Sequence, residues 1–149
     1  MNTEEANILR RQLVENYHSV MMTASGYSMF PFLRNGDRLT VSPFPLEKIQ
    51  IGDIAVFEQN NLWIPHRVIA IENKDNETIL LLRGDTCIQM DLPVTKKNYI
   101  GKIQYFERKE KEYSIDSFKK RNRRIVKLGT LRVRILSVIK IFAIRLKNF

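Results

Sequence analysis

A serine in a loop rich in glycine and proline is the first residue whose surroundings could support chemistry. Ser28 lies in the segment GYSMFP at residues 26–31, between a predicted strand and a loop interrupted by proline. A serine hydroxyl is a weak nucleophile until a neighbouring base accepts its proton. The chain has two histidines, His18 at the end of a predicted helix and His66 in a β-type run. Because such partners meet in space rather than in sequence, the spacing permits a pair between Ser28 and His66 without requiring it.

Two aspartates could complete such a pair by orienting the imidazole. A carboxylate that accepts the N–H of a histidine base holds the ring in place and stabilises its charged form. Asp85 and Asp91 both lie at predicted turns, from which either side chain can point into a site. The sequence leaves open which of them does so, whereas Asp37 and Asp53 are more typical of turn-forming residues.

Short β-type runs make up most of the chain between residues 20 and 106. Turn residues, chiefly glycine, asparagine, aspartate and proline, separate the runs. The six candidate strands are Val20 to Thr23, Arg38 to Val41, Ile54 to Phe57, Trp63 to Ile71, Thr78 to Leu82 and Tyr99 to Phe106. Apolar residues at helical spacing predict a short helix over Glu4 to Tyr17. The sequence therefore predicts a mostly β domain with a short amino-terminal helix.

The distribution of charge separates a carboxyl-terminal segment from this domain. Residues 117–149 hold 11 of the 25 Lys and Arg and none of the 16 Asp and Glu, so the net charge of +9 resides in this segment. The one cysteine excludes an internal disulfide framework. The predicted organisation is a helical lead-in over residues 1–19, a β domain over 20–106, a charged linker over 107–124 and a basic amphipathic helix over 125–149.

The carboxyl-terminal helix has three interpretations. The apolar stripe of this helix begins at Leu128 and ends at Phe149, with Lys and Arg beside it. Such a stripe is typical of a helix that lies on an anionic membrane surface, and the basic cluster Lys119 to Arg124 would add electrostatic attraction. The helix could instead dock on the core of the domain. Its charges could also bind nucleic acid, but that would not explain Leu, Ile and Phe at helical spacing. We favour the membrane surface, which predicts peripheral membrane association through residues 117–149 and, because no run of about 18 uncharged apolar residues occurs, no transmembrane helix.

Six short motifs in a fixed order resemble the S24/S26 peptidase families, and most closely the Ser/His branch of the type I signal peptidases. The motifs cover roughly residues 24–105 and are Ser28-Met29-Phe30-Pro31, Gly36-Asp37, Gly52 to Phe57, His66-Arg67-Val68, Gly84-Asp85 with Asp91, and Gly101-Lys102. Any one of them alone is a weak signal, whereas six in order are a strong one. The resemblance implies a mostly β, strongly bent sheet assembly like those of signal peptidases and LexA.

The resemblance also implies a role for particular residues. Ser28 would attack the scissile carbonyl, and its backbone N–H would be an oxyanion-hole donor. His66 stands where bacterial signal peptidases and LexA-like repressors have a lysine, so it would be the base. Asp85 and Asp91 match the two acidic positions of the family. Met29 and Pro31 would shape the loop and a substrate pocket.

The implied function is a serine endopeptidase that cleaves a leader or signal peptide, with small side chains near the cut and with no cofactor or metal. A peptide or preprotein would be the substrate, an export transporter is the candidate partner, and no specific nucleic acid is expected. One alternative is a self-cleaving regulatory relative, although the roughly 20 residues before the β region are too few for a helix-turn-helix unit. A second is a non-catalytic binding module. The chain has Thr86-Cys87 where the family often has two asparagines, and the basic tail is expected to replace the family's amino-terminal anchor.

Overall fold

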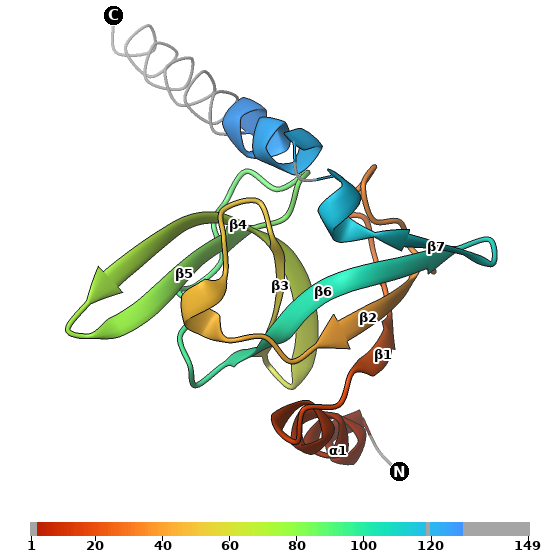
Figure 1. The fold of residues 1–149 in the computed structure, drawn as a ribbon, viewed down its shortest axis with the longest axis horizontal. Helices are drawn as coiled ribbons and strands as arrows, with labels where there is room; N and C mark the ends of the chain where they lie inside the picture. The colour runs from red at the N-terminus through yellow and green to blue at the C-terminus, as the bar shows by residue number, and fades with distance from the viewer. Residues whose placement is uncertain (1–2, 119, 130–149) are drawn as a thin grey trace, which may run out of the picture.

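A single antiparallel sheet forms the body of the protein. The structure is a computed structural model that describes residues 3–118 and 120–129 (Figure 1). After helix α1 (Thr3–Glu15) the strands are β1 (Val20–Thr23), β2 (Arg38–Ser42), β3 (Ile54–Gln59), β4 (Leu62–Lys74), β5 (Glu77–Arg83), β6 (Tyr99–Arg108) and β7 (Lys111–Ser114). Two short 3₁₀ helices, η1 (Leu46–Lys48) and η2 (Ile115–Phe118), lie between and after the strands, and a further helix covers residues 120–129. The predicted mostly β fold and the short amino-terminal helix are confirmed.

The order of the strands places β6 at the centre of the sheet. The sequence of neighbours is β1-β2-β6-β3-β4-β5, and β7 also pairs with β6. All six pairings are antiparallel. Three of them shift register partway along, in β2 after Thr40, in β3 after Val56 and in β4 after Val68. Such irregularities bend and twist the strands that carry them, so the sheet curves instead of forming a flat layer.

Three hairpins have two-residue turns in which both residues have positive φ. The turns are Asn60-Asn61 between β3 and β4, Asp75-Asn76 between β4 and β5, and Lys109-Glu110 between β6 and β7. Turns of this kind match the right-handed twist of the flanking strands, and Asn and Asp tolerate this backbone conformation. Lys and Glu give no such signal in a sequence.

The predicted charged linker over 107–124 is wrong, because the sequence gives no signal for the turn at Lys109-Glu110 or for the strand that follows it. Residues up to Arg108 continue β6, and Lys111–Ser114 form β7 against it. The charged side chains of β7 hide its strand character, and charge is a common protection for a strand with few neighbours. Tyr113 is the exception, since its ring stacks on Phe106 at a centroid distance of 5.0 Å.

Buried apolar side chains form two clusters on the curved sheet. The first lies over β2, β3 and β6 and includes Met29, Phe32 and Leu33 from the loop between β1 and β2. The second packs between β3, β4, β5 and the segment around Val94. Burial of each large apolar side chain contributes about 1.5–3 kcal/mol relative to exposure in water. The loop that carries Ser28 is therefore held to the first cluster by three buried side chains on its carboxyl-terminal side.

The two aspartates assigned to turns lie in them as expected. The Asp37 carboxylate accepts a hydrogen bond from the backbone N–H of Arg34, and the Asp53 carboxylate accepts one from the N–H of Gln50. Each also pairs with a cation from β6. Asp53 Oδ1 lies 3.0 Å from the amine of buried Lys102.

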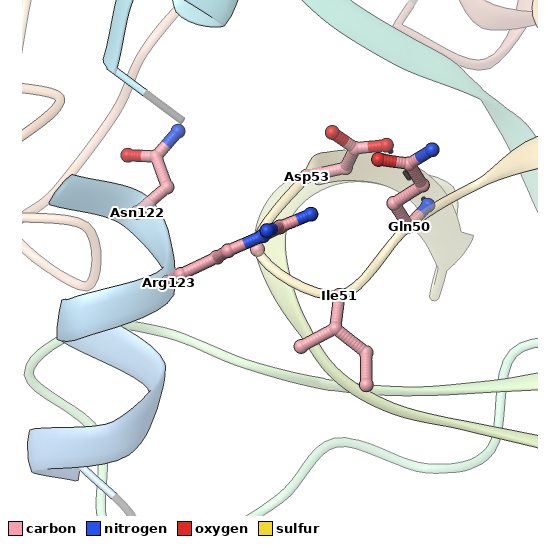
Figure 2. Close-up of a pocket in the computed structure, with 6 residues that line it drawn as sticks. Gln50, Ile51, Asp53, Asn122 and Arg123 are labelled. Atoms are coloured by element: carbon pink, nitrogen blue, oxygen red, sulfur yellow. Dashed lines mark hydrogen bonds between the residues drawn. The ribbon is translucent and has the colours of Figure 1, made fainter. Parts of the chain in front are cut away.

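The helix over residues 120–129 begins inside the predicted linker and packs on the domain. Asn122 and Val126 are buried, and Asn122 and Arg123 lie against Gly52 in the turn before β3. Figure 2 shows Arg123 reaching from this helix toward the turn that holds Gln50 and Asp53. Leu128, the first residue of the predicted apolar stripe, is 66% exposed. Residues 120–129 thus pack on the domain through Asn122 and Val126, while Leu128 faces away from it.

The remainder of the predicted basic amphipathic helix, residues 130–149, lies outside the described residues. Within the described part of the chain, no helix is long and apolar enough to cross a membrane.

Candidate functional site

Ser28 lies in the loop between β1 and β2, at one edge of the sheet. Strand β1 is the outermost strand on its side, and the chain passes directly from it into this loop. Gly26 opens the turn with a φ of 80° and donates its N–H to the Asn35 side chain at 3.0 Å. Ser28 itself is half-exposed, whereas Met29, which follows it, is 4% exposed. The loop therefore presents the hydroxyl at the surface while its next residue is fixed in the core.

Three side chains predicted for the site form one continuous hydrogen-bonded chain. Ser28 Oγ lies 3.0 Å from His66 Nε2, and His66 Nδ1 lies 2.6 Å from Asp91 Oδ2. His66 is 8% exposed, so most of its ring is removed from water. This is the arrangement in which an imidazole accepts a proton from a serine while a carboxylate holds its other nitrogen.

Strand β4 supplies the histidine from a well-fixed position. His66 pairs with Ala55 of β3, and Ala55 pairs in turn with Lys102 of β6, so the imidazole is carried by three adjacent strands. The small side chain of Ala55 beside it is fully buried. The neighbouring ring of Phe57 lies 6.0 Å from the imidazole centroid. The base is thus built on the rigid part of the sheet, which limits its rotation.

The segment between β5 and β6 brings Asp91 to the histidine. The backbone N–H of Asp91 donates to the carbonyl of Leu82 at 2.9 Å, and Leu80 and Val94 exchange two backbone hydrogen bonds. These bonds return the segment to β5 after a loop that leaves the sheet at Gly84. The side chain of Asp91 is 18% exposed, so water reaches part of the carboxylate.

Asp85, the other acidic candidate, binds an arginine instead of the histidine. Its two oxygens each lie 2.7 Å from Arg67, one from Nε and one from the terminal Nη2. Arg67 is fully buried, donates a third hydrogen bond to the carbonyl of Gly52, and lies 4.9 Å from the centroid of the Phe32 ring. A planar guanidinium satisfied in this way on several sides fixes its partners in place. Asp85 therefore joins the loop after β5 to strand β4. Both lie next to residues 24–37, the loop that carries Ser28 and is called the serine loop below.

Gly84 and Thr86 flank this aspartate and contact the backbone of Ser28. The N–H of Thr86 donates to the Ser28 carbonyl at 2.9 Å, and the Thr86 hydroxyl is 3.1 Å from the same oxygen. A Cβ on Gly84 would lie 2.9 Å from that oxygen, 3.0 Å from Ser28 Cβ and 2.8 Å from Cys87 Sγ. The position of the serine hydroxyl thus depends on the absence of a side chain at residue 84.

Replacing Gly84 by alanine is expected to displace Ser28 from His66 and to lower the rate at which the Ser28 hydroxyl reacts with a fluorophosphonate probe by about 10²-fold, because a shift of about 1 Å in a reacting group has effects of this size. The measurement is the second-order rate constant of labelling together with the midpoint of thermal unfolding. The double variant Gly84→Ala/Cys87→Ala relieves the contact with sulfur and keeps the contact with the Ser28 backbone, so it is expected to stay impaired. Full recovery of the labelling rate in the double variant would contradict the proposed contact.

The two residues predicted to shape a substrate pocket lie in different surroundings. Met29 belongs to the core and also lines a cavity of about 10 Å³ together with Gly26, Ser28 and Pro65. Pro31 is exposed and lines a larger groove, whose lining shares Arg34 with this cavity. Large apolar side chains around the site are also exposed, namely Tyr27, Phe30, Ile88, Met90 and Leu92. In the described residues, no three His, Cys, Asp or Glu gather in a way that could hold a metal ion.

Arg67, Gly84 and Thr86 received no role from the sequence. The first two lie inside recognised motifs, but nothing in the motif says that the arginine is buried or that the glycine touches the serine. Thr86 stands at a position where the chain departs from the motifs that it otherwise resembles, and its hydroxyl and N–H both reach the Ser28 carbonyl.

Comparison with known proteins leaves the interpretation to the residues themselves. No known family model matches this chain, and no curated protein matches it.

Proposed function

We propose that this protein is a serine endopeptidase with Ser28 as nucleophile, His66 as general base and Asp91 as the carboxylate that orients the base. The observation that carries the proposal is the pair of distances at the imidazole, 3.0 Å to the Ser28 hydroxyl and 2.6 Å to the Asp91 carboxylate. Nucleophile and base lie within the range required for direct proton transfer. The carboxylate on the other nitrogen favours the tautomer whose Nε2 can accept the proton.

The reaction follows from these positions. As Ser28 Oγ attacks the carbonyl carbon of the peptide bond, its proton passes to His66 Nε2, and Asp91 stabilises the resulting imidazolium. His66 then gives the proton to the leaving amine, and the peptide bond breaks to leave an acyl ester on Ser28. A water molecule attacks the ester after losing a proton to His66, and the acid product leaves as the serine recovers its proton. In the described residues the N–H of Ser28 donates no hydrogen bond, so it is available to the oxyanion, where one donor contributes about 2.7–4 kcal/mol.

The surroundings of Ser28 favour an extended peptide with a small side chain at the cut. Among the described strands, β1 pairs with β2 alone, which leaves its other edge unpaired, and it leads into the serine loop. An extended peptide can add to such an edge through main-chain hydrogen bonds. The cavity of about 10 Å³ beside Ser28 has room for one water-sized group. A side chain of the size of alanine suits this space better than a large one. The same restriction is implied by the resemblance to signal peptidases.

The more specific proposal is a peptidase of the signal-peptidase type that processes a leader or signal peptide. Its support is the convergence of three motifs, since the serine, histidine and second aspartate motifs meet at one point although they are separated by up to 63 residues. The curved sheet with three register shifts agrees with the bent signal-peptidase and LexA-like assembly that the motifs imply. Peripheral association with an anionic membrane through residues 117–149, and cooperation with an export transporter, are parts of this proposal.

Labelling with a fluorophosphonate probe tests the function directly. The probe is expected to modify Ser28 in the full-length protein, with the site identified by peptide mass, and to fail with His66→Ala because the hydroxyl loses its base. In parallel, synthetic leader peptides with alanine near the predicted cut are expected to give two products and no modified enzyme at completion. Labelling at any other residue, or labelling of Ser28 that is unchanged in His66→Ala, would contradict the assignment. Absence of both labelling and cleavage would favour a non-catalytic binding module.

A further inference from the structure

A groove lined by arginines and aromatic rings lies beside the serine loop, which forms part of its lining. Its volume is about 760 Å³, and its lining includes Phe30 and Pro31 from the serine loop and Thr86, which binds the Ser28 carbonyl. The rest of the lining comes from Phe32 and Arg34 of the same loop, from Asp85, and from side chains of β6, β7, η2 and the helix over 120–129. The docked helix thus completes a surface that starts within two residues of the nucleophile.

Within the part of the chain that the structure describes, two of the three arginines in this groove form no ion pair. Arg108 is held by Asp37, with two hydrogen bonds of 2.8 and 2.5 Å, and these bonds raise the pKa of the guanidinium above its usual value. Arg34 and Arg121 make no ion pair within the described residues. The sequence contains no Asp or Glu after Asp116, so the remaining residues of the tail supply no acidic side chain to neutralise them.

The single acidic side chain in the lining is already neutralised. Asp85 contributes to the groove, but both of its oxygens are bonded to Arg67 and its side chain is 5% exposed. Within the described residues, the groove therefore contains two arginines, Arg34 and Arg121, that no ion pair neutralises.

The aromatic rings give the groove an apolar floor beneath these charges. Arg121 lies 5.0 Å from the centroid of the Phe118 ring and 5.1 Å from that of Phe32, which fixes its guanidinium over the rings. Phe106 and Tyr113 stack beside them. Arginine stacked on aromatic rings loses less freedom when it binds a carboxylate, because its planar group is already held.

We propose that this groove binds an acidic segment of the peptide substrate, in which Asp or Glu lies next to an apolar or aromatic residue. The inference rests on the proposed function and names the class of its substrate. A carboxylate would pair with Arg34 or Arg121, and the neighbouring apolar side chain would pack on the aromatic floor. The proposed occupant is a peptide because Phe30 and Pro31, two and three residues after Ser28, line the groove, so a peptide held at Ser28 can continue into it. Anionic lipid is the competing occupant, and the experiment distinguishes the two.

The experiment measures binding separately from cleavage. The full-length Ser28→Ala variant is titrated against three fluorescein-labelled decapeptides that share an Ala-Ala-Ala centre and carry Phe-Glu, Phe-Gln or Phe-Lys beside it. Each peptide is made twice, with the pair before or after the centre. When the pair lies on one particular side of the Ala-Ala-Ala centre, the Phe-Glu peptide is expected to bind about tenfold more tightly than the Phe-Gln peptide at low salt. The Phe-Lys peptide is expected to bind more weakly than the Phe-Gln peptide. This preference is expected to diminish as salt is raised.

Variants of the arginines assign the effect to the groove. In the Ser28→Ala background, Arg34→Gln and Arg121→Gln together are expected to abolish the preference for Phe-Glu over Phe-Gln, and Arg34→Lys to preserve part of it. Arg123→Gln is the matched control, because it removes the same charge from the same helix on the side that faces Gln50 and Asp53 (Figure 2). Arg123→Gln is expected to keep the preference.

The outcomes separate this inference from the proposed function. A preference for Phe-Glu that depends on Arg34 and Arg121, together with no peptide cleavage by the wild-type protein, would support the groove and refute the peptidase. Cleavage without any preference for acidic peptides on either side would support the peptidase and refute the groove. Loss of the preference in Arg123→Gln would also refute it. So would binding of phosphatidylglycerol vesicles that depends on Arg34 and Arg121, together with no binding of the acidic peptides.

Discussion

Substitution of Ser28 by alanine is expected to reduce kcat for peptide cleavage by about 10⁶-fold, because the variant has no nucleophile and leaves His66 without a hydroxyl to activate. The fold should be unaffected. Ser28 is half-exposed and its side chain bonds to His66, whereas the loop is fixed by the buried side chains of Met29, Phe32 and Leu33. The measurement is cleavage of an alanine-containing leader peptide followed by mass spectrometry, with thermal unfolding of the same samples.

Ser25→Ala is the matched control for this substitution. Ser25 lies three residues earlier in the same loop, is exposed and lines the same cavity as Ser28, but the hydrogen bonds of the His66 ring within the described residues go to Ser28 and Asp91. Its replacement is expected to change kcat by less than about tenfold and the free energy of unfolding by less than about 0.5 kcal/mol. If Ser28→Ala retained more than a few per cent of wild-type kcat with a pure sample, Ser28 would not be the nucleophile.

Substitution of Asp91 by asparagine is expected to lower kcat by about 10⁴-fold with little change in stability. An asparagine that replaces the carboxylate is nearly isosteric, but it cannot stabilise the imidazolium, and its amide group can donate to Nδ1 and favour the wrong tautomer. The 18% exposure of the Asp91 side chain lets water satisfy the new amide, so the fold should tolerate it. The measurement is kcat at saturating peptide, together with the midpoint of urea unfolding.

Asp85→Asn gives the opposite pattern and serves as the comparison. It leaves the buried guanidinium of Arg67 with an incomplete partner, and breaking a buried ion pair typically costs about 3–5 kcal/mol. The urea midpoint is therefore expected to fall clearly for Asp85→Asn and to stay near the wild-type value for Asp91→Asn. A large loss of kcat in Asp85→Asn at unchanged stability, with wild-type kcat in Asp91→Asn, would reverse the assignment of the two aspartates.

The position and number of most strands could be predicted from the sequence because each is a short β-type run bounded by turn residues. Val20–Thr23 was predicted at its observed bounds, and the other five runs were predicted within three residues at each end. Their ends extend further in the structure because hairpin pairing continues up to the tight turns, as at Asn60-Asn61. These are local properties, set by side-chain type and by the backbone conformations that asparagine and aspartate tolerate.

The seventh strand and the docked helix could not be predicted in the same way. Lys111–Ser114 contains one aromatic residue among charged ones, and its turn is formed by Lys109 and Glu110, which carry no turn signal. The helix over 120–129 buries Asn122 and Val126 rather than the stripe that begins at Leu128. Both depend on surfaces supplied by distant parts of the chain, the Phe106 ring for β7 and the turn at Gly52 for the helix.

For the candidate site, the sequence by itself determined a serine, a histidine and two acidic positions, together with the strand that carries the histidine. Only the tertiary structure decided between the acids. Asp85 and Asp91 lie six residues apart in one loop, and spacing along a loop does not determine where its side chains point. The direction is fixed by long-range contacts, since fully buried Arg67 holds Asp85, and the bond from the Asp91 N–H to Leu82 turns the chain back so that Asp91 meets the imidazole. A carboxylate pairs with the cation or N–H group that the fold places beside it, and that neighbour comes from another strand.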